Sequence, residues 1–329
     1  MVGGNISSEK IDLLIYGPGK PIVDNGFSDQ FVLHPFETKH DLERLPPAIA
    51  GKIRGAAVTY STVRGDSTTL SLFPKLEIVS SFGVGYDHID ANYARDHNIV
   101  VTNTPDVLTE EVADIAMGLL IATLREFIKA DRYLRSGLWM TQNFPLSVGS
   151  LRDRKVGMVG MGRIGQAIGR RLDASRVPVV YHSRNPADGV SYKHYPDLIE
   201  MAKAVDTLVV ITPGGAATAK LINADVMKAL GPRGVIINVA RGSVIDEPAL
   251  ISALKSGTIL AAGLDVFANE PAVPDELRAM QNVVLLPHIG SASVVTRNAM
   301  DQLVVDNLKA WFAGKAPLTP IPETPVKGR

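Results

Sequence analysis

Three segments of the chain place an ionisable side chain directly after a short apolar run. "NVARG" brings Arg241, "GLDVFANEP" brings Asp265 and Glu270, and "LLPHIG" brings His288. A histidine can exchange a proton near neutral pH, and a carboxylate bonded to one ring nitrogen favours the protonated form. A guanidinium binds a carboxylate through two parallel hydrogen bonds. These residue types could therefore hold an anionic substrate and move a proton to or from it.

Taken singly, each of these residues also has a structural explanation. A lone histidine is more often a satisfied core or surface residue than a catalytic one, and an arginine that ends a strand often makes a salt bridge. We interpret six other histidines in this structural way: His34, His40, His88, His97, His182 and His194.

A glycine-rich turn supplies a second candidate site. Gly160, Gly162 and Gly165 form G-x-G-x-x-G between an apolar run and a helical pattern. Glycines at this spacing allow a tight turn, close approach of the backbone to a pyrophosphate and close packing of the helix on the strand. The pattern alone is weak, and a turn without a ligand is the alternative. The strand–turn–helix context favours a dinucleotide site.

The stretch "VVYHSRNP" stands where a dinucleotide site for NAD carries an acidic residue, about 20 positions after the turn, and it contains no acid. Ser183 and Arg184 would donate hydrogen bonds to a 2′-phosphate, so the sequence predicts NADP(H). It leaves open whether His182 or Ser183 takes the acidic position. The alternative is that Arg184 is only a solvated loop cation.

Short apolar runs alternate with helical patterns along most of the chain, which predicts βαβ units and parallel strands covered on both faces. The early runs start near Ile11, Ala56, Leu76 and Asn98, and the late runs near Lys155, Val177, Thr207, Gly234, Ala261 and Asn282. These ten predicted strands are more than a single sheet of this kind usually contains. Between the two series we expect a long helix, N-capped by Thr109 and buried on several sides, with Phe127 and Ile128 among its apolar residues.

Length and composition indicate a globular protein. At 329 residues, with 46% hydrophobic side chains, the chain can form two domains. Lys plus Arg and Asp plus Glu number 34 each, so net charge favours neither nucleic acid nor a membrane surface. The chain has no cysteine and no ligand spacing typical of a metal site, so we expect no metal. Without a signal peptide or an apolar segment of ~20 residues, we expect a cytoplasmic enzyme.

Six segments in their order resemble the D-2-hydroxyacid dehydrogenase family over nearly the whole chain: "SFGVGYDHID", "VTNTPDVLTEEVAD", "VGMVGMGRIG", "NVARGSVIDEPAL", "AGLDVFANEP" and "LLPHIGSAS". Within that family, Ser183, Arg184, Trp139 and the short C-terminus are most similar to the NADP-dependent glyoxylate/hydroxypyruvate reductases, with plant hydroxyphenylpyruvate reductases close by.

The resemblance implies an α/β fold of two doubly wound parallel-sheet domains. Residues 1–103 and 289–329 would form a flavodoxin-like substrate domain. A Rossmann NADP-binding domain of residues 104–288 would be inserted into it, with the cleft at the two crossovers. The family also implies a homodimer, in which the helix after Thr109 and the loop "RSGLWMTQN" reach the partner.

The resemblance groups Arg241, Glu270 and His288 as the catalytic residues for the reduction of a 2-oxo acid. NADPH would supply the hydride. His288, held by Glu270, would donate the proton, and Arg241 would bind the carboxylate and polarise the carbonyl.

Further binding residues follow from the same resemblance. The N–H groups of Val84 and Gly85, in a turn before a predicted helix, would hold the other carboxylate oxygen, and Trp139 would shape the substrate pocket. Asp265 would bind the nicotinamide carboxamide. The other expected cofactor contacts, besides Arg241, His288 and the glycine turn, are Thr109, Arg163, Ile164, Thr212, Pro213, Val239 and Gly290.

The expected substrates are glyoxylate and hydroxypyruvate, with phenylpyruvate as a third candidate and a D product. Several 2-oxo acids should be accepted, because an apolar pocket discriminates one methylene by only ~1–3 kcal/mol. Phosphoglycerate dehydrogenases share the triad, but little chain follows His288 to form a regulatory domain, and formate dehydrogenases have Gln where Glu270 stands. A dinucleotide-sensing corepressor is the non-enzyme alternative; it would show negligible turnover of glyoxylate with NADPH.

Overall fold

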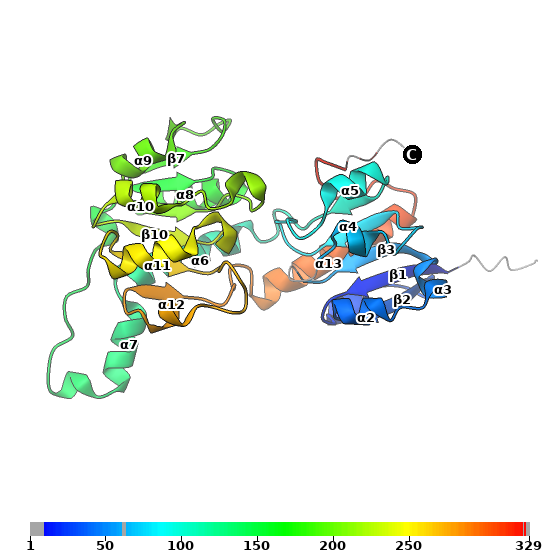
Figure 1. Ribbon diagram of the computed structural model, residues 1–329, viewed down its shortest axis with the longest axis horizontal. Coiled ribbons are helices and arrows are strands. Elements are labelled where there is room, and N and C mark those ends of the chain that lie inside the picture. Colours follow the sequence, from blue (N-terminus) through cyan, green and yellow to red (C-terminus); the bar gives the residue numbers. More distant parts are fainter. Residues whose placement is uncertain (1–9, 61–63, 325, 327–329) are drawn as a thin grey trace, which may run out of the picture. The chain divides into compact units, whose positions relative to one another are not determined.

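The computed structural model describes residues 10–60, 64–324 and 326, so parts of both ends of the predicted substrate domain lie outside it. The chain divides into two compact units (Figure 1). Unit 1 consists of Met1–Leu108 and Val294–Arg329, and unit 2 of Thr109–Ser293. The boundaries expected from the sequence, 103/104 and 288/289, each fall a few residues earlier.

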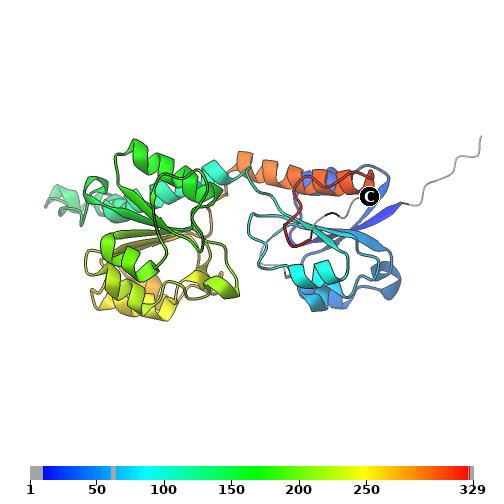
Figure 2. The same cartoon turned by 90° about the horizontal axis from the view of Figure 1, so that it is seen from above.

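Unit 1 is built around a five-stranded parallel sheet in the order β2-β1-β3-β4-β5. Its strands are β1 (Ile11–Tyr16), β2 (Phe31–Phe36), β3 (Ile53–Val58), β4 (Ile78–Ser81) and β5 (Val100–Thr102). One face packs its apolar side chains against α2 (Lys39–Glu43), α3 (Pro47–Ala50), α4 (Ser67–Leu70) and α5 (Ala91–Asp96). The opposite face is covered by α13 (Val294–Phe312), with α1 (Pro21–Asn25) beside it (Figure 2). This strand order is that of flavodoxin-like sheets.

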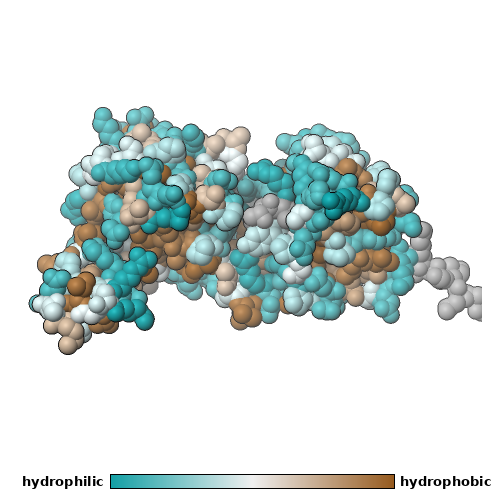
Figure 3. Space-filling model, turned by 60° about the horizontal axis from the view of Figure 1, so that its bottom comes forward, coloured by the Kyte–Doolittle hydropathy of each residue, from teal (hydrophilic) through white to brown (hydrophobic). Residues whose placement is uncertain are grey.

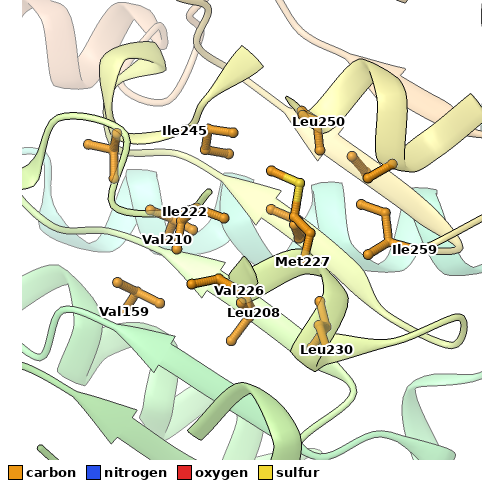
Figure 4. Close-up of a cluster of buried hydrophobic side chains, with 14 of the residues drawn as sticks. Val159, Leu208, Val210, Ile222, Val226, Met227, Leu230, Ile245, Leu250 and Ile259 are labelled. Atoms are coloured by element: carbon orange, nitrogen blue, oxygen red, sulfur yellow. The ribbon is translucent and has the colours of Figure 1, made fainter. Parts of the chain in front are cut away.

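Unit 2 contains a seven-stranded parallel sheet in the order β12-β11-β10-β9-β6-β7-β8. Its strands are β6 (Val156–Val159), β7 (Val179–His182), β8 (Lys193–Tyr195), β9 (Thr207–Val210), β10 (Val235–Asn238), β11 (Ala261–Leu264) and β12 (Val283–Leu285). One face packs on α9 (Leu198–Ala204), α10 (Ala224–Leu230), α11 (Glu247–Lys255) and α12 (Asp275–Ala279). Figure 4 shows the part of this apolar cluster that lies against α10 and α11. The helices α6 (Thr109–Leu124) and α8 (Arg163–Ala174) cover the other face. The order is that of a Rossmann sheet with one further strand.

The expected α/β fold with two parallel sheets is confirmed. The strands β6, β9, β10 and β11 are buried at every position, because helices cover both faces, and this burial explains their continuous apolar runs. Two strands were not predicted, β2 and β8, and each lies at the edge of its sheet. β2 contains Pro35, which an edge strand tolerates because one side of its backbone needs no partner.

The single long helix predicted between the two strand series is wrong. The backbone turns at Glu126, whose φ of 52° is left-handed, so that α6 ends and α7 (Phe127–Arg135) begins. Thr109 is the first helical residue of α6 rather than a cap before it. None of the α7 residues is buried: Phe127 is 53% exposed and Ile128 44%. We call residues 127–148 the arm; α7 begins it, and it extends away from the rest of unit 2 (Figure 1).

No helix in the described residues is long and apolar enough to cross a membrane. The described side chains also include no group of three or more His, Cys, Asp or Glu that could hold a metal ion. Charged side chains at the surface form ion pairs, for example those of Glu110 on α6 with Arg170 and Arg171 on α8.

Candidate active site

The glycine turn lies between β6 and α8. Gly160 has a φ of 105°, and a Cβ there would lie 2.7 Å from the carbonyl oxygen of Ile211. A Cβ at Gly165 would lie 2.6 Å from the carbonyl oxygen of Gly160, so only glycine allows the helix to pack this closely. A Cβ at Gly162, by contrast, would meet nothing within 4 Å. A side chain at Gly162 would thus enter open space at the N-terminus of α8, where the first N–H groups have no intrahelical partner and point to where an anionic group such as a pyrophosphate binds in dinucleotide sites.

The end of β7 lies beside this turn. His182, the last residue of the strand, accepts a hydrogen bond from the Gly160 N–H at 2.9 Å. The residue at the strand end is therefore His182 rather than Ser183. The Ser183 hydroxyl donates to the carbonyl oxygen of Asn185 at 2.5 Å. Arg184 is exposed and makes no hydrogen bond or ion pair with the described residues, so its guanidinium is available to an anionic group.

Arg241 follows β10 on a loop that a buried amide holds in place. The Asn238 side chain accepts from the Ala240 N–H at 3.0 Å and donates to the carbonyl oxygen of Arg241 at 3.1 Å. Gly242 packs so closely on the loop after β11 that a Cβ there would overlap the backbone of Phe267. Asn238 was not predicted as a site residue, although it stands in the same "NVARG" segment and asparagine often bonds to backbone groups two or three residues away.

Asp265, directly after β11, holds the turn that follows β12. Only 1% exposed, it accepts from the Ile289 N–H at 2.7 Å and the Gly290 N–H at 2.8 Å, and its backbone oxygen accepts from the His288 N–H at 2.9 Å. Burial raises the pKa of the Asp265 carboxyl, against the opposing effect of the two N–H groups. His288 has a φ of 56°, which is unfavourable for a residue with a side chain. Asp265 thus stabilises the backbone that presents His288, a role the sequence did not reveal.

The side chains of Glu270 and His288 meet at these strand ends. Nδ1 of His288 lies 2.7 Å from Oε2 of Glu270, and the side chains are 32% and 27% exposed, respectively. Because an ionised carboxylate only accepts, Nδ1 carries the hydrogen and Nε2 is left to exchange a proton. Burial would raise the pKa of Glu270, but the bond and charge of His288, the Phe267 N–H and the charge of Arg241 together hold it below its usual value.

In unit 1, the turn after β4 presents backbone groups instead of ionisable side chains. Gly83, with a φ of 117°, donates its N–H to Oγ1 of Thr104 and accepts the Thr104 N–H, both at 2.9 Å. The Asn103 amide donates to the carbonyl oxygen of Val84 at 2.8 Å, and the Thr319 hydroxyl donates to the Asn103 carbonyl oxygen at 2.6 Å. Polar side chains therefore fix the orientation of the peptide groups in this turn.

The helix expected after this turn begins later along the chain. α5 starts only at Ala91, after residues that form turns and bends. The N–H groups of Val84 and Gly85 therefore belong to a supported turn and not to a helix N-terminus.

The other predicted cofactor residues of unit 2 stand where its helices begin or its strands end. Thr109 opens α6, and Val112 in the next turn of that helix lies beside Gly290. The rest are Arg163 and Ile164 in the first turn of α8, Thr212 and Pro213 after β9, and Val239 after β10. Their contacts with a cofactor remain predictions.

Trp139 is placed differently. It lies on the arm and is 63% exposed, and its neighbour Leu138 lines a groove with Leu260 and Asn282 at the amino-terminal ends of β11 and β12. The carboxyl ends of these strands carry Asp265 and lead to His288. Within one chain, the structure does not bring Trp139 to the His288 side of the sheet.

Residues 117–290 match the sequence profile described as "D-isomer specific 2-hydroxyacid dehydrogenase, NAD binding domain". The chain is 45% identical to glyoxylate/hydroxypyruvate reductase A of Arabidopsis thaliana over 95% of this chain and 99% of that protein. It is 42% identical to hydroxyphenylpyruvate reductase of Plectranthus scutellarioides, with the same coverage of 95% and 99%. Its structure resembles the crystal structure of the NADPH-dependent glyoxylate/hydroxypyruvate reductase of Sinorhizobium meliloti in complex with NADP and malonate. The TM-score is 0.92 and the sequence identity 51%, over 98% of this chain and 99% of that one.

Proposed function

Because the chain belongs to the D-isomer-specific 2-hydroxyacid dehydrogenase family, we propose that it uses NADPH to reduce small 2-oxo acids to D-2-hydroxy acids. Glyoxylate and hydroxypyruvate are the first candidates, in line with the names of its relatives, and phenylpyruvate is the third, because one relative is named for the related hydroxyphenylpyruvate. The observation that carries the proposal is the 2.7 Å contact between His288 and Glu270, on the sheet that also bears the glycine turn.

His288 and Glu270 act together as the proton donor. When bound, the nicotinamide ring supplies the hydride that reaches C2 of the 2-oxo acid. His288 holds a proton at Nε2 and transfers it to the carbonyl oxygen, while Glu270 keeps Nδ1 bonded and stabilises the imidazolium beforehand. Asp265 supports the strained backbone of His288, so the ring stays in place.

Arg241 and the turn of unit 1 bind the substrate. The Arg241 guanidinium engages the carboxylate and polarises the carbonyl as negative charge develops on oxygen. The N–H groups of Val84 and Gly85 donate to the other carboxylate oxygen, and the hydrogen bond from Asn103 to Val84 supports that turn.

The end of β7 favours NADPH. It carries no acid that would accept from a ribose 2′-hydroxyl, and the exposed Arg184 can donate to a 2′-phosphate. The relative from Sinorhizobium meliloti, which is described as NADPH-dependent, supports this part of the proposal. The cytoplasmic location expected from the sequence stays a prediction.

We also propose that the chain forms a homodimer through the arm. Large apolar side chains are exposed along it: Phe127, Ile128, Leu134, Leu138, Trp139, Met140, Leu146 and Val148. A groove of about 540 Å³ lies between α7 and the amino-terminal ends of β11 and β12, and Figure 3 shows apolar residues gathered over unit 2 beside the arm. Exposed apolar patches often mark association sites. A second copy on this surface would also give Trp139 a substrate site to reach. Light scattering tests this proposal: the wild-type chain should be a dimer, and Leu134→Glu should be a monomer.

One panel of assays tests the activity. Glyoxylate, hydroxypyruvate, pyruvate and phenylpyruvate are each offered with NADPH and with NADH, and oxidation of the cofactor is followed by absorbance. We expect turnover with the first two acids, a preference for NADPH and, from hydroxypyruvate, whose product is chiral, a D product by chiral chromatography. Negligible turnover with every acid, despite measurable NADPH binding, would instead indicate a protein that binds the dinucleotide without catalysis.

A further inference from the structure

The imidazole of His182 is fixed in one tautomer at the end of β7. Its Nδ1 lies 2.9 Å from the carbonyl oxygen of Tyr195, on the neighbouring strand β8. A carbonyl oxygen can only accept, so Nδ1 carries a hydrogen whether the ring is neutral or charged. Nε2 is then the atom whose protonation can change, and within the described residues the ring has no second hydrogen bond or ion pair.

His182 also lies at the position that distinguishes the adenosine ribose of NADH from that of NADPH. In dinucleotide sites of this topology, the residue that ends the second strand meets the 2′ position of the adenosine ribose. β7 is that strand, and the bond from the Gly160 N–H to the His182 carbonyl oxygen ties its end to the glycine turn. The His182 side chain is half-buried, which leaves part of the ring accessible to a ligand.

Several residues that can carry charge stand close to His182 along the chain or at the start of nearby elements. They are Arg184 and Asp188 in the turn after β7, Lys193 and His194 on β8, Asp197 at the start of α9 and Arg163 at the start of α8. Nε2 of His194 lies 2.9 Å from the carbonyl oxygen of Ser183, so this second imidazole holds the turn. The cations outnumber the acids, which favours a ligand that carries negative charge.

We propose that the protonation state of His182 selects between the two nicotinamide cofactors. In the neutral ring, Nε2 accepts a hydrogen bond from the 2′-hydroxyl of NADH, as the usual acid would. In the charged ring, which takes its proton from water, Nε2 donates to the 2′-phosphate of NADPH. The enzyme therefore uses both cofactors and prefers NADPH more strongly as the pH falls. This inference rests on the proposed function, which makes the dinucleotide the ligand of unit 2.

Direct binding measures the selection without any turnover. Dissociation constants for NADPH and NADH are determined by fluorescence titration between about pH 6 and pH 8, where a histidine changes charge. We expect the preference for NADPH to rise about tenfold or more toward the lower pH, the effect of one charge-assisted hydrogen bond. Calorimetry of NADPH binding in two buffers of different ionisation enthalpy should show proton uptake.

Two variants distinguish the pH dependence caused by His182 from that caused by its neighbours or by titration of the 2′-phosphate. His182→Asn keeps an amide donor for the Tyr195 carbonyl oxygen but cannot titrate, so the preference should lose most of its pH dependence. His194→Gln keeps a donor for the Ser183 carbonyl oxygen and should retain that dependence. A preference that varies with pH equally in wild type and His182→Asn, or not at all in wild type, overturns the inference. If 2-oxo acids are nevertheless reduced, the proposed function stands. If no 2-oxo acid is reduced while the binding preference follows His182, the function fails and the cofactor selection stands.

Discussion

The two units share an architecture, a parallel sheet between two layers of helices, but they present different chemistry at the carboxyl ends of their strands. Unit 2 presents side chains: Arg241, Glu270 and His288 each follow a different strand. Unit 1 presents the peptide N–H groups of the turn after β4, which Asn103 and its neighbours hold in place. A side chain can be replaced without changing the backbone, whereas a backbone donor changes only through the groups that support it. Substitutions of the unit 2 side chains Arg241, Glu270 and His288 should therefore act on the chemical step, and those in the turn of unit 1 on substrate binding.

The largest effect is expected at His288. His288→Asn removes the proton donor but retains an amide that can bond to Glu270, so kcat should fall about 10²–10⁴-fold. NADPH affinity, measured by fluorescence titration, should be nearly unchanged. If kcat stayed near the wild-type value with hydride transfer shown to be rate-limiting, the proton would have to come from another group, and unit 2 would lose its assigned part in the chemistry.

Arg241→Lys should give the next largest loss. An ammonium lacks the planar fork that engages a carboxylate and a carbonyl together, so kcat/KM for glyoxylate should fall about a hundredfold. Arg170→Lys, on the exposed surface of α8, serves as the matched control and should remain close to wild type. Comparable efficiency in Arg241→Lys would show that a point charge is sufficient.

Arg184→Ala should change the cofactor preference rather than the chemical step. Only NADPH loses a charge-assisted contact, so the ratio of kcat/KM with NADPH to that with NADH should fall about ten- to a hundredfold. NADH provides the internal control. Adding His182→Asp supplies an acceptor for the ribose hydroxyl and should lower the ratio further. An unchanged ratio in both variants would mean that the phosphate is recognised elsewhere.

The smallest effect is expected in unit 1. Asn103→Ala leaves the Val84 carbonyl oxygen without its amide donor, so the turn loosens and KM for the 2-oxo acid should rise about three- to tenfold. Both kcat and the dissociation constant for NADPH should change little, because the chemistry and the cofactor belong to unit 2. A loss of kcat comparable to that of His288→Asn would break the division between side-chain and backbone chemistry.

The sequence predicts the central strands well because their burial leaves continuous apolar runs. It fails at two of the four edge strands: β2 is interrupted by Pro35, and β8 consists of Lys193, His194 and Tyr195 and has no apolar run. It also fails at Glu126, where nothing in the helical pattern shows that the chain adopts a left-handed conformation. The exposed apolar residues of α7 were assigned to the core because composition cannot distinguish a core from a surface that binds another molecule.

The candidate site likewise has features that the sequence predicts and features that only the structure reveals. The glycine turn and the strand-end residues are predictable because local spacing determines their positions. The hydrogen bonds from Ile289 and Gly290 to Asp265 join segments far apart in the sequence, so only the structure reveals that Asp265 supports His288. The identity of the residue at the end of β7, His182, also required the register of the strands.

Unit 1 is interrupted in the sequence by the whole of unit 2, and this has a consequence for biosynthesis. A ribosome delivers all of unit 2 before it delivers α13, whose buried residues Met300, Val304 and Leu308 belong to the core of unit 1. Until then, the faces of β3 and β4 that α13 covers lack their partner, although unit 2 can already fold. Nascent unit 1 is therefore the part most exposed to aggregation and to chaperones. Substitutions in α13 should lower the cellular yield of the protein by more than their effect on the free energy of unfolding indicates.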